Sequence, residues 1–289
     1  MNYKLKKYQQ AFSLIELSIV ILIIGILVAG VTQSSRLVRQ IKIKSIQNIT
    51  LNSPIPSIKD LMMWLETTQE KSFIDTEQQN SSTVSIWYDN NMTSIDKNNA
   101  ISPAATNYPI YVENVFNGVI PSLRFDGVND YFNFNSSAML NTNFTVFAVE
   151  SRRSAGINQF FLGGSTTGNF HIGYVNSTTI RSGRYGVIGS DFFDYAISAY
   201  TSPTPRIHTF LHSSTLGKKY WINGGLTPEA SSNNTLTLTV YSGVIGNTEG
   251  NWFYSGDIGE IIIYTRALSN EERMAIEEYL GKKFQIVIS

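Results

Sequence analysis

Cysteine is absent from this 289-residue chain, and charged residues make up only 15% of it. The fold therefore has no disulfide and no thiolate metal site. The 22 basic and 22 acidic side chains cancel, so the charge gives no sign of a nucleic-acid partner. Hydrophobic residues reach 42%, enough for a packed core. The aromatic content of 12% and the 21 glycines favour strands and turns over a helical bundle.

The long apolar run, Phe12–Val31, has no proline and a single charged residue, Glu16. Because a helix rises about 1.5 Å per residue, the run covers roughly 30 Å, the thickness of a bilayer core. It is too long for a secretory signal peptide and lacks a small-residue cleavage site, so it predicts a membrane span. Lys4, Lys6 and Lys7 precede the run, which keeps the N-terminus cytoplasmic.

A plain membrane anchor explains the length of the run and the lysines, but it does not explain Glu16. A carboxylate in hydrocarbon costs several kcal/mol unless it is paired, so an acid there is a functional candidate. We expect no partner for Glu16 within its own apolar run, which points to a partner on another chain.

A basic leader, a small residue and a Phe-Ser-Leu-Ile-Glu sequence before the apolar run resemble the N-terminus of type IV pilins and pseudopilins. The matching residues are Ala11, Phe12, Ser13, Leu14, Ile15 and Glu16. The family usually has glycine where this chain has Ala11, and alanine is small enough to fit. The resemblance implies that a prepilin peptidase cleaves between Ala11 and Phe12 and that the new Phe12 amine is methylated. It also implies that Glu16 pairs with that amine of a neighbouring subunit and sets the register of assembly.

The helix is expected to continue to Ser53, because no proline or glycine occurs from Val31 to that point. The sequence SPIPS then stops it, since proline lacks an amide donor. The predicted organisation is a leader, a pilin-type membrane helix, a linker and a C-terminal domain, with the boundaries 1–11, 12–53, 54–57 and 58–289.

The C-terminal domain alternates apolar and polar residues, as strands do. Residues 121–134 predict two short strands around a turn at Asp126–Asn129, and 143–150 predicts a central strand that is apolar on both faces. Residues 219–225 predict a strand that enters an Asn-Gly hairpin turn. A buried strand follows within 255–268.

Ser269 and Glu272 then form a capping box that begins a short helix ending near Leu280. Many short strands with Gly and Asn turns favour an all-β jelly-roll sandwich with a short C-terminal helix. In this order the segments resemble the concanavalin A-like lectin/glucanase superfamily, especially laminin-G-like domains. The matching residues are 61–67, 84–90, 123–134, 220–225 and 256–280.

Catalysis is not favoured by the sequence. Glycosidases on this scaffold place carboxylates on one face of a strand, about 5 Å apart in retaining enzymes. The nearest candidates, Asp257 and Glu260, have an odd spacing and are expected to face opposite sides. His208 and His212 lie on a predicted strand, roughly 13 Å apart and without a third ligand, so a structural role is favoured over zinc. We therefore predict no catalytic and no metal-ligating residue.

Ligand contacts are predicted from two weaker patterns. Asp126, Asn129 and Asp130 carry oxygens of the kind that calcium binds, but a solvated turn is favoured because such side chains stabilise turns by themselves, and no cofactor is predicted. Of the four tryptophans, those at 64, 87 and 221 lie within apolar alternation and are expected in the core, whereas Trp252 lies in a predicted loop and is the candidate sugar-stacking residue.

The favoured function is a pilin-like subunit, a minor pilin or pseudopilin. It would hold a lectin-like domain outside the bacterial inner membrane for adhesion or for binding carbohydrate or a surface protein. Its partners would be other pilin subunits, the prepilin peptidase and the membrane, with no nucleic acid. The alternatives are a monomeric membrane-anchored carbohydrate-binding module and, less favoured, a glycan-cleaving enzyme. The N-terminal motif favours the first, and the missing carboxylate cluster disfavours the last.

Overall fold

The computed structural model describes residues 13–140, 143–164, 168–184, 191–239, 242–248 and 251–289, with the backbone but not the side chains of 31–36. The chain divides into two compact units, 1–44 and 45–289; we call the second unit the head. Helix α1 (Leu14–Leu51) begins in the first unit, and its last two turns belong to the head. Among the residues that the structure describes, no helix combines the length and the apolar character that a membrane crossing needs.

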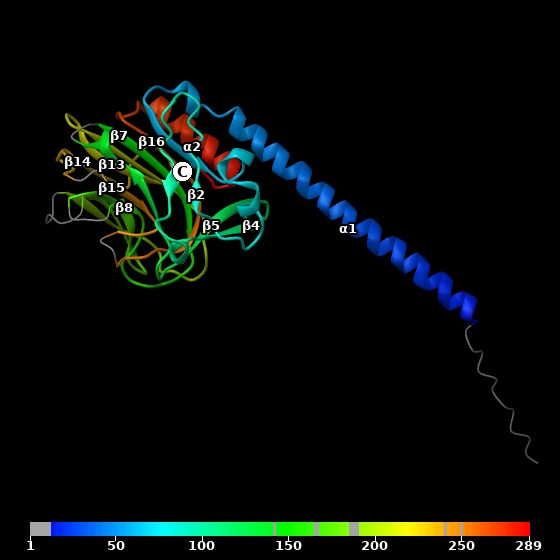
Figure 1. Cartoon of the computed structure of the whole chain (residues 1–289). Coiled ribbons are helices and arrows are strands. Elements are labelled where there is room, and N and C mark those ends of the chain that lie inside the picture. Colours follow the sequence, from blue (N-terminus) through cyan, green and yellow to red (C-terminus); the bar gives the residue numbers. More distant parts are fainter. Residues whose placement is uncertain (1–12, 141–142, 165–167, 185–190, 240–241, 249–250) are drawn as a thin grey trace, which may run out of the picture. The chain divides into compact units, whose positions relative to one another are not determined.

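The head is a sandwich of two antiparallel sheets (Figure 1). The first sheet has the strand order β14 (Ala230–Ser232), β13 (Gly217–Ile222), β12 (Arg206–Ser213), β7 (Phe144–Arg152), β16 (Ser255–Tyr264), β5 (Ile120–Asp126) and β4 (Ile110–Phe116), and β1 (Leu61–Glu66) also pairs with β16. The second sheet has the order β11 (Phe192–Ala196), β10 (Thr179–Arg184), β9 (Phe170–Asn176), β8 (Gln159–Gly164), β15 (Ser242–Ile245), β6 (Phe132–Asn135), β3 (Ala100–Ile101) and β2 (Ile86–Trp87).

One hydrophobic core fills the space between the sheets. Every residue of β7 is buried, and Val146 and Ala148 belong to the core. This confirms the central strand predicted from its apolar residues on both faces. The predicted strands around Asp126–Asn129 are also present, as β5 and β6, but they belong to different sheets. The turn between them therefore carries the chain from one layer of the sandwich to the other.

The strand predicted to enter an Asn-Gly turn is β13, and it forms an antiparallel hairpin with β14, with a loop longer than two residues. Asn223 and Gly224 have positive φ, as Asn-Gly turns require, and the next strand begins at Ala230. Asn223 continues the pairing with β12. Its N–H donates to Ile207 O at 2.7 Å, and its side-chain oxygen accepts the Ile207 N–H at 3.0 Å. Tertiary pairing with β12 thus decides where the chain goes next.

The predicted opposite orientation of Asp257 and Glu260 is wrong because β16 contains a β-bulge. Its register with β7 shifts between Ile258 and Glu260, which inserts Gly259. Ile258 and Ile261 both belong to the core, so Asp257 and Glu260 point to the same outer face of the first sheet.

Helix α2 (Asn270–Phe284) covers part of this outer face (Figure 1, red). The predicted capping box is present: Ser269 Oγ accepts the Glu272 N–H at 3.3 Å, and the Glu272 carboxylate accepts the Ser269 N–H at 3.0 Å. The helix runs past the predicted end near Leu280 because Lys283 and Phe284, in its last turn, are both buried against the head. The remaining regular elements are 3-10 turns at Ile55–Ser57, Glu70–Ser72, Asp75–Glu77, Ala105–Asn107 and Ser137–Met139.

Candidate functional site

The N-terminal motif is described from Ser13 onward, so Ala11 and Phe12 lie outside the described residues. At the start of α1, the Ser13 N–H donates to Glu16 Oε2 at 2.9 Å, and Ser13 Oγ accepts the Ile15 N–H at 3.3 Å. The Glu16 side chain thus supplies its half of a capping box, while the Ser13 hydroxyl caps the N–H at the second helical position. The expectation that Glu16 has no partner near its own run is therefore wrong, because the backbone of Ser13 supplies one. The Ser-x-x-Glu spacing before an apolar run was the sequence signal for it.

On both sides of Glu16, from Leu14 to Val28, α1 presents apolar side chains around its surface. They are exposed in the isolated chain, with exposed fractions from 48% to 85%: Leu14, Ile15, Leu17, Ile19, Val20, Ile21, Leu22, Ile23, Ile24, Ile26, Leu27 and Val28. The Ser18 hydroxyl donates back to Leu14 O at 2.8 Å, so it needs no outside partner. Exposed apolar surface of this extent marks a surface that other molecules cover.

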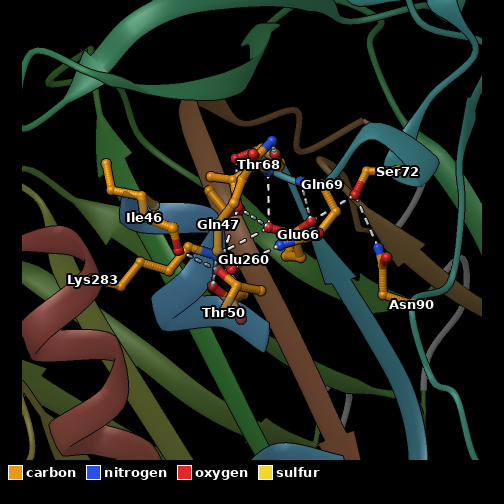
Figure 2. Close-up of polar contacts among 12 residues, drawn as sticks. Ile46, Gln47, Thr50, Glu66, Thr68, Gln69, Ser72, Asn90, Glu260 and Lys283 are labelled. Atoms are coloured by element: carbon orange, nitrogen blue, oxygen red, sulfur yellow. Dashed lines mark hydrogen bonds and ion pairs between the residues drawn. The ribbon is translucent and has the colours of Figure 1, made fainter. Parts of the chain in front are cut away.

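A buried charge network lies where the end of α1 joins the sandwich (Figure 2). Lys283 Nζ, from α2, lies 3.0 Å from Glu66 Oε2 of β1 and 2.8 Å from Glu260 Oε2 of β16. Glu260 Oε1 also accepts the Trp64 indole N–H at 2.7 Å and the Tyr279 hydroxyl at 2.9 Å. One lysine thus joins carboxylates from two neighbouring strands.

The two carboxylates have pKa values shifted in opposite directions. Burial alone would raise the pKa of Glu66, but the Lys283 charge and hydrogen bonds from Thr68 and Ser72 outweigh burial and lower it. For Glu260, burial is the larger effect and the pKa is raised, although Lys283 offsets part of it. Burial would lower the pKa of Lys283, and the two carboxylates outweigh burial and raise it.

The last turns of α1 are tied to the segment that follows Glu66. The Gln47 side-chain amide donates to Thr68 O at 2.8 Å, and the Gln69 amide donates to Gln47 O at 3.2 Å. Thr50 Oγ1 lies 3.4 Å from Thr68 Oγ1, whose hydroxyl donates to Glu66 Oε2 at 2.6 Å (Figure 2). The helix end, the first strand and α2 therefore share one set of hydrogen bonds.

A pair of acids with diverging pKa values is also what acid–base catalysis uses. Here Glu66, Glu260 and Lys283 are all 0–1% exposed, so a substrate has no access to them. The sequence analysis did not find this network, because its members lie on three elements that only the fold brings together. The available signal was Glu66 at the end of an otherwise apolar strand.

The other candidate acid, Asp257, is held by arginines. Arg124 Nε donates to Asp257 Oδ1 at 2.8 Å and Arg124 Nη2 donates to Oδ2 at 3.1 Å, with Arg153 at 3.5 Å. The Ser122 hydroxyl donates to the same carboxylate at 2.9 Å. Asp257 and Glu260 share a face, but each is already bound to its own cation.

His208 and His212 lie on strand β12 as predicted, and both have structural partners. His208 Nδ1 lies 2.6 Å from the Tyr220 hydroxyl, and His208 Nε2 lies 2.8 Å from Glu150 Oε1. His212 Nε2 accepts the Leu236 N–H at 2.9 Å. Both ring nitrogens of His208 thus serve hydrogen bonds within the core.

In the acidic turn between β5 and β6, the carboxylate oxygens accept hydrogen bonds from the backbone of the turn itself. Asp126 Oδ1 accepts N–H groups from Val128, Asn129 and Asp130 at 2.8 to 3.4 Å, and Asp130 Oδ2 accepts the Asp126 N–H at 2.9 Å. Within the described ranges, no group of three or more His, Cys, Asp or Glu side chains could hold a metal ion.

The three tryptophans predicted to lie in the core are buried. Trp64, Trp87 and Trp221 are 0–3% exposed. Trp252 is half-buried and stacks on Phe160, with ring centroids 5.4 Å apart and planes at 26°. One face of its indole is thus already covered by protein.

The family described as Prokaryotic N-terminal methylation motif matches residues 6–32. No curated protein matches the chain. Two solved structures resemble it at 16% identity. Trypanosoma rangeli sialidase in complex with 2,3-difluorosialic acid has a TM-score of 0.54, and the match covers 91% of this chain and 40% of the sialidase. The botulinum neurotoxin serotype D binding domain has a TM-score of 0.52, with 80% of this chain and 53% of that domain covered.

At this identity, and with this chain spanning about half or less of those proteins, the likeness shows the fold alone. The chain therefore carries a prepilin-type methylation motif at its N-terminus. Behind that motif lie a helix and an all-β jelly-roll sandwich with a short C-terminal helix.

Proposed function

We propose that this chain is a pilin-like subunit, a minor pilin or pseudopilin, which is processed by a prepilin peptidase and displays its lectin-like sandwich outside the membrane. The observation that carries the proposal is the match of residues 6–32 to the methylation motif. The exposed apolar side chains of α1 from Leu14 to Val28 support it, because the bilayer and the helices of neighbouring subunits are apolar surroundings that would cover them.

In this proposal, the chain is cut between Ala11 and Phe12 and sits in the inner membrane as a single-pass protein before assembly. Glu16 then has two tasks. Its carboxylate accepts the Ser13 N–H at the start of the helix, and it attracts the charged Phe12 amine of a neighbouring subunit. The attraction is strong in apolar surroundings, where either charge alone is costly.

The boundaries that we propose remain a leader at 1–11, a pilin-type helix at 12–53, a linker at 54–57 and a sandwich at 58–289. The head is proposed to bind a carbohydrate or a surface protein and not to catalyse a reaction. The buried state of Glu66 and Glu260 and the arginine contacts of Asp257 support this, because these carboxylates are engaged by protein cations. Trp252 is proposed as a ligand contact because its side chain is only half-buried.

Mass spectrometry of the N-terminus of protein from the native host tests the proposal. We expect a mature chain that begins with methylated Phe12. A chain that still begins at Met1, or one that is cut after Val31, would contradict it. If the chain is processed but never enters a filament, a monomeric membrane-anchored binding module becomes the better description.

A further inference from the structure

A charged cluster replaces the hydrophobic core at one end of the sandwich. Along β7, the side chains that face the second sheet are Val146 and Ala148, and then Glu150 and Arg152. Arg206, the first residue of β12, pairs with Glu150 across the sheet. The inward face of the central strand therefore changes from apolar to charged over two successive inward positions.

The Glu150 carboxylate is fully engaged by uncharged hydroxyls and an imidazole. Glu150 Oε1 accepts the Tyr174 hydroxyl at 2.6 Å and lies 2.8 Å from His208 Nε2, while Oε2 accepts the Tyr254 hydroxyl. Burial would raise the pKa of Glu150, but His208 and the two tyrosines outweigh burial and lower it. Glu150 is therefore an anion, and within the described part of the chain its side-chain hydrogen bonds are made with Tyr174, His208 and Tyr254.

Arg152 is a buried cation whose direct partners are uncharged. Its guanidinium donates to the backbone oxygens of Asn176 at 3.0 Å and Gly156 at 2.5 Å, and its Nε is buried without a hydrogen-bond partner. Arg152 is only 1% exposed, and its guanidinium carbon lies 4.4 Å from the centre of the Tyr174 ring. Burial lowers the pKa of Arg152, yet an arginine keeps its proton in a protein.

A pocket of about 260 Å³ opens beside this cation. Arg206, which donates to the Tyr174 hydroxyl at 3.3 Å, lines it as well. The segment 197–205 forms another side of the pocket and contains no charged residue. Two arginines thus face one carboxylate, and the site has an excess of positive charge. Several lining residues of the pocket carry hydroxyl groups: Ser198, Tyr200, Thr201, Ser202 and Thr204.

We propose that this pocket binds a small sugar that carries a carboxylate. The half-buried Arg206 guanidinium receives the carboxylate, the preferred partner of arginine, and the buried Arg152 behind it adds positive charge without direct contact. The hydroxyls of segment 197–205 receive the ring hydroxyls, and the Tyr200 ring packs on the sugar. This inference rests on the proposed ligand-binding role of the head and is independent of filament assembly.

Isothermal titration of the full-length protein in detergent with D-glucuronate and D-galacturonate tests the proposal. D-glucose and D-galactose are matched neutral probes that lack only the carboxylate, and acetate lacks only the sugar. We expect saturable binding of at least one uronate, and binding of the neutral sugars and of acetate weaker by at least about tenfold. Arg206→Met should weaken uronate binding by a similar factor, and Tyr200→Ala should weaken it several-fold.

Arg153→Met is the matched control, because Arg153 follows Arg152 but contacts Asp257 on the outer face. It should leave uronate binding within about twofold. Far-UV circular dichroism shows whether each variant is folded; if Arg206→Met fails to fold, Tyr200→Ala decides. Absence of binding by both uronates, equal binding of glucose or acetate, or unchanged binding in a folded Arg206→Met protein would overturn the proposal. A processed, assembled subunit that binds no uronate would refute this pocket and leave the assembly proposal intact.

Discussion

Lys283 Nζ lies 3.0 Å from Glu66 Oε2, and neither side chain is exposed to solvent. The two residues are 217 positions apart in the sequence, one in the first strand of the head and the other in its last helix. Their ion pair joins β1, which lies next to the end of α1, to α2 near the C-terminus of the chain.

Replacing Lys283 with methionine should strongly destabilise the head. The variant leaves Glu66 and Glu260 facing each other without a cation, and breaking a buried ion pair in this way costs about 3–5 kcal/mol. Urea unfolding followed by circular dichroism measures the change. Lys282→Met is the matched control, since Lys282 is exposed, and it should shift the free energy of unfolding by less than about 0.5 kcal/mol. Similar stabilities for the two variants would show that the network contributes little.

Two substitutions of Glu16 separate its role as a cap from its role as a charge. Glutamine at this position preserves an acceptor for the Ser13 N–H but removes the charge, whereas alanine removes both. If Glu16 pairs with the Phe12 amine of a neighbour, Glu16→Gln and Glu16→Ala should both lose incorporation into filaments. The measurement is the amount of protein in sheared surface filaments at matched membrane levels. Normal incorporation of Glu16→Gln would assign the residue to helix capping alone.

His171 should make the head sensitive to mild acid. Burial, with a smaller contribution from the Arg181 charge, lowers the pKa of His171 to about 3. Because the unfolded chain binds the proton near pH 6.5, the stabilisation is complete above that pH and is lost as the pH falls toward 3. At pH 5 the loss amounts to about 2 kcal/mol. His171→Gln should lose less stability than the unchanged protein between pH 7 and pH 5, as measured by urea unfolding; parallel pH profiles would contradict this.

Asp130 should give the stability of the head the opposite pH dependence from His171. Burial is the largest effect, and together with the charge of Asp126 it raises the pKa of Asp130 to about 6. The hydrogen bond from the Asp126 N–H lowers the pKa and offsets part of this rise. Its contribution to stability is therefore complete below about pH 4 and is lost as the pH rises through 6. Solvent near this turn reduces the effect to the order of 1 kcal/mol.

Asp130→Asn should remove this loss, because the amide oxygen still accepts the Asp126 N–H but carries no charge. The difference in unfolding free energy between pH 4 and pH 7 is the quantity to compare. Asp126→Asn should in turn lower the pKa of Asp130, which carbon-13 NMR of the carboxyl group reports. An Asp130 that titrates near 4 in the unchanged protein would disprove the shift.

The sequence by itself determined the features that depend on local order and periodicity. The motif from Ser13 to Glu16, the alternation that makes β7 a central strand, and the capping box of Ser269 are all properties of neighbouring residues. Each is set by backbone hydrogen bonds or side-chain direction within a few positions. The same holds for the three core tryptophans, whose apolar neighbours predict burial.

Only the tertiary structure decided the features that depend on which strands meet. The bulge at Gly259 turns Asp257 and Glu260 to one face, and continued pairing with β12 at Asn223 lengthens the loop of the β13–β14 hairpin. The Lys283 network and the Arg152 pocket likewise join elements that lie far apart in the sequence. Pairing and packing between distant segments set these contacts, because an Asn-Gly turn or a strand period contributes less free energy than the pairing and burial that override it.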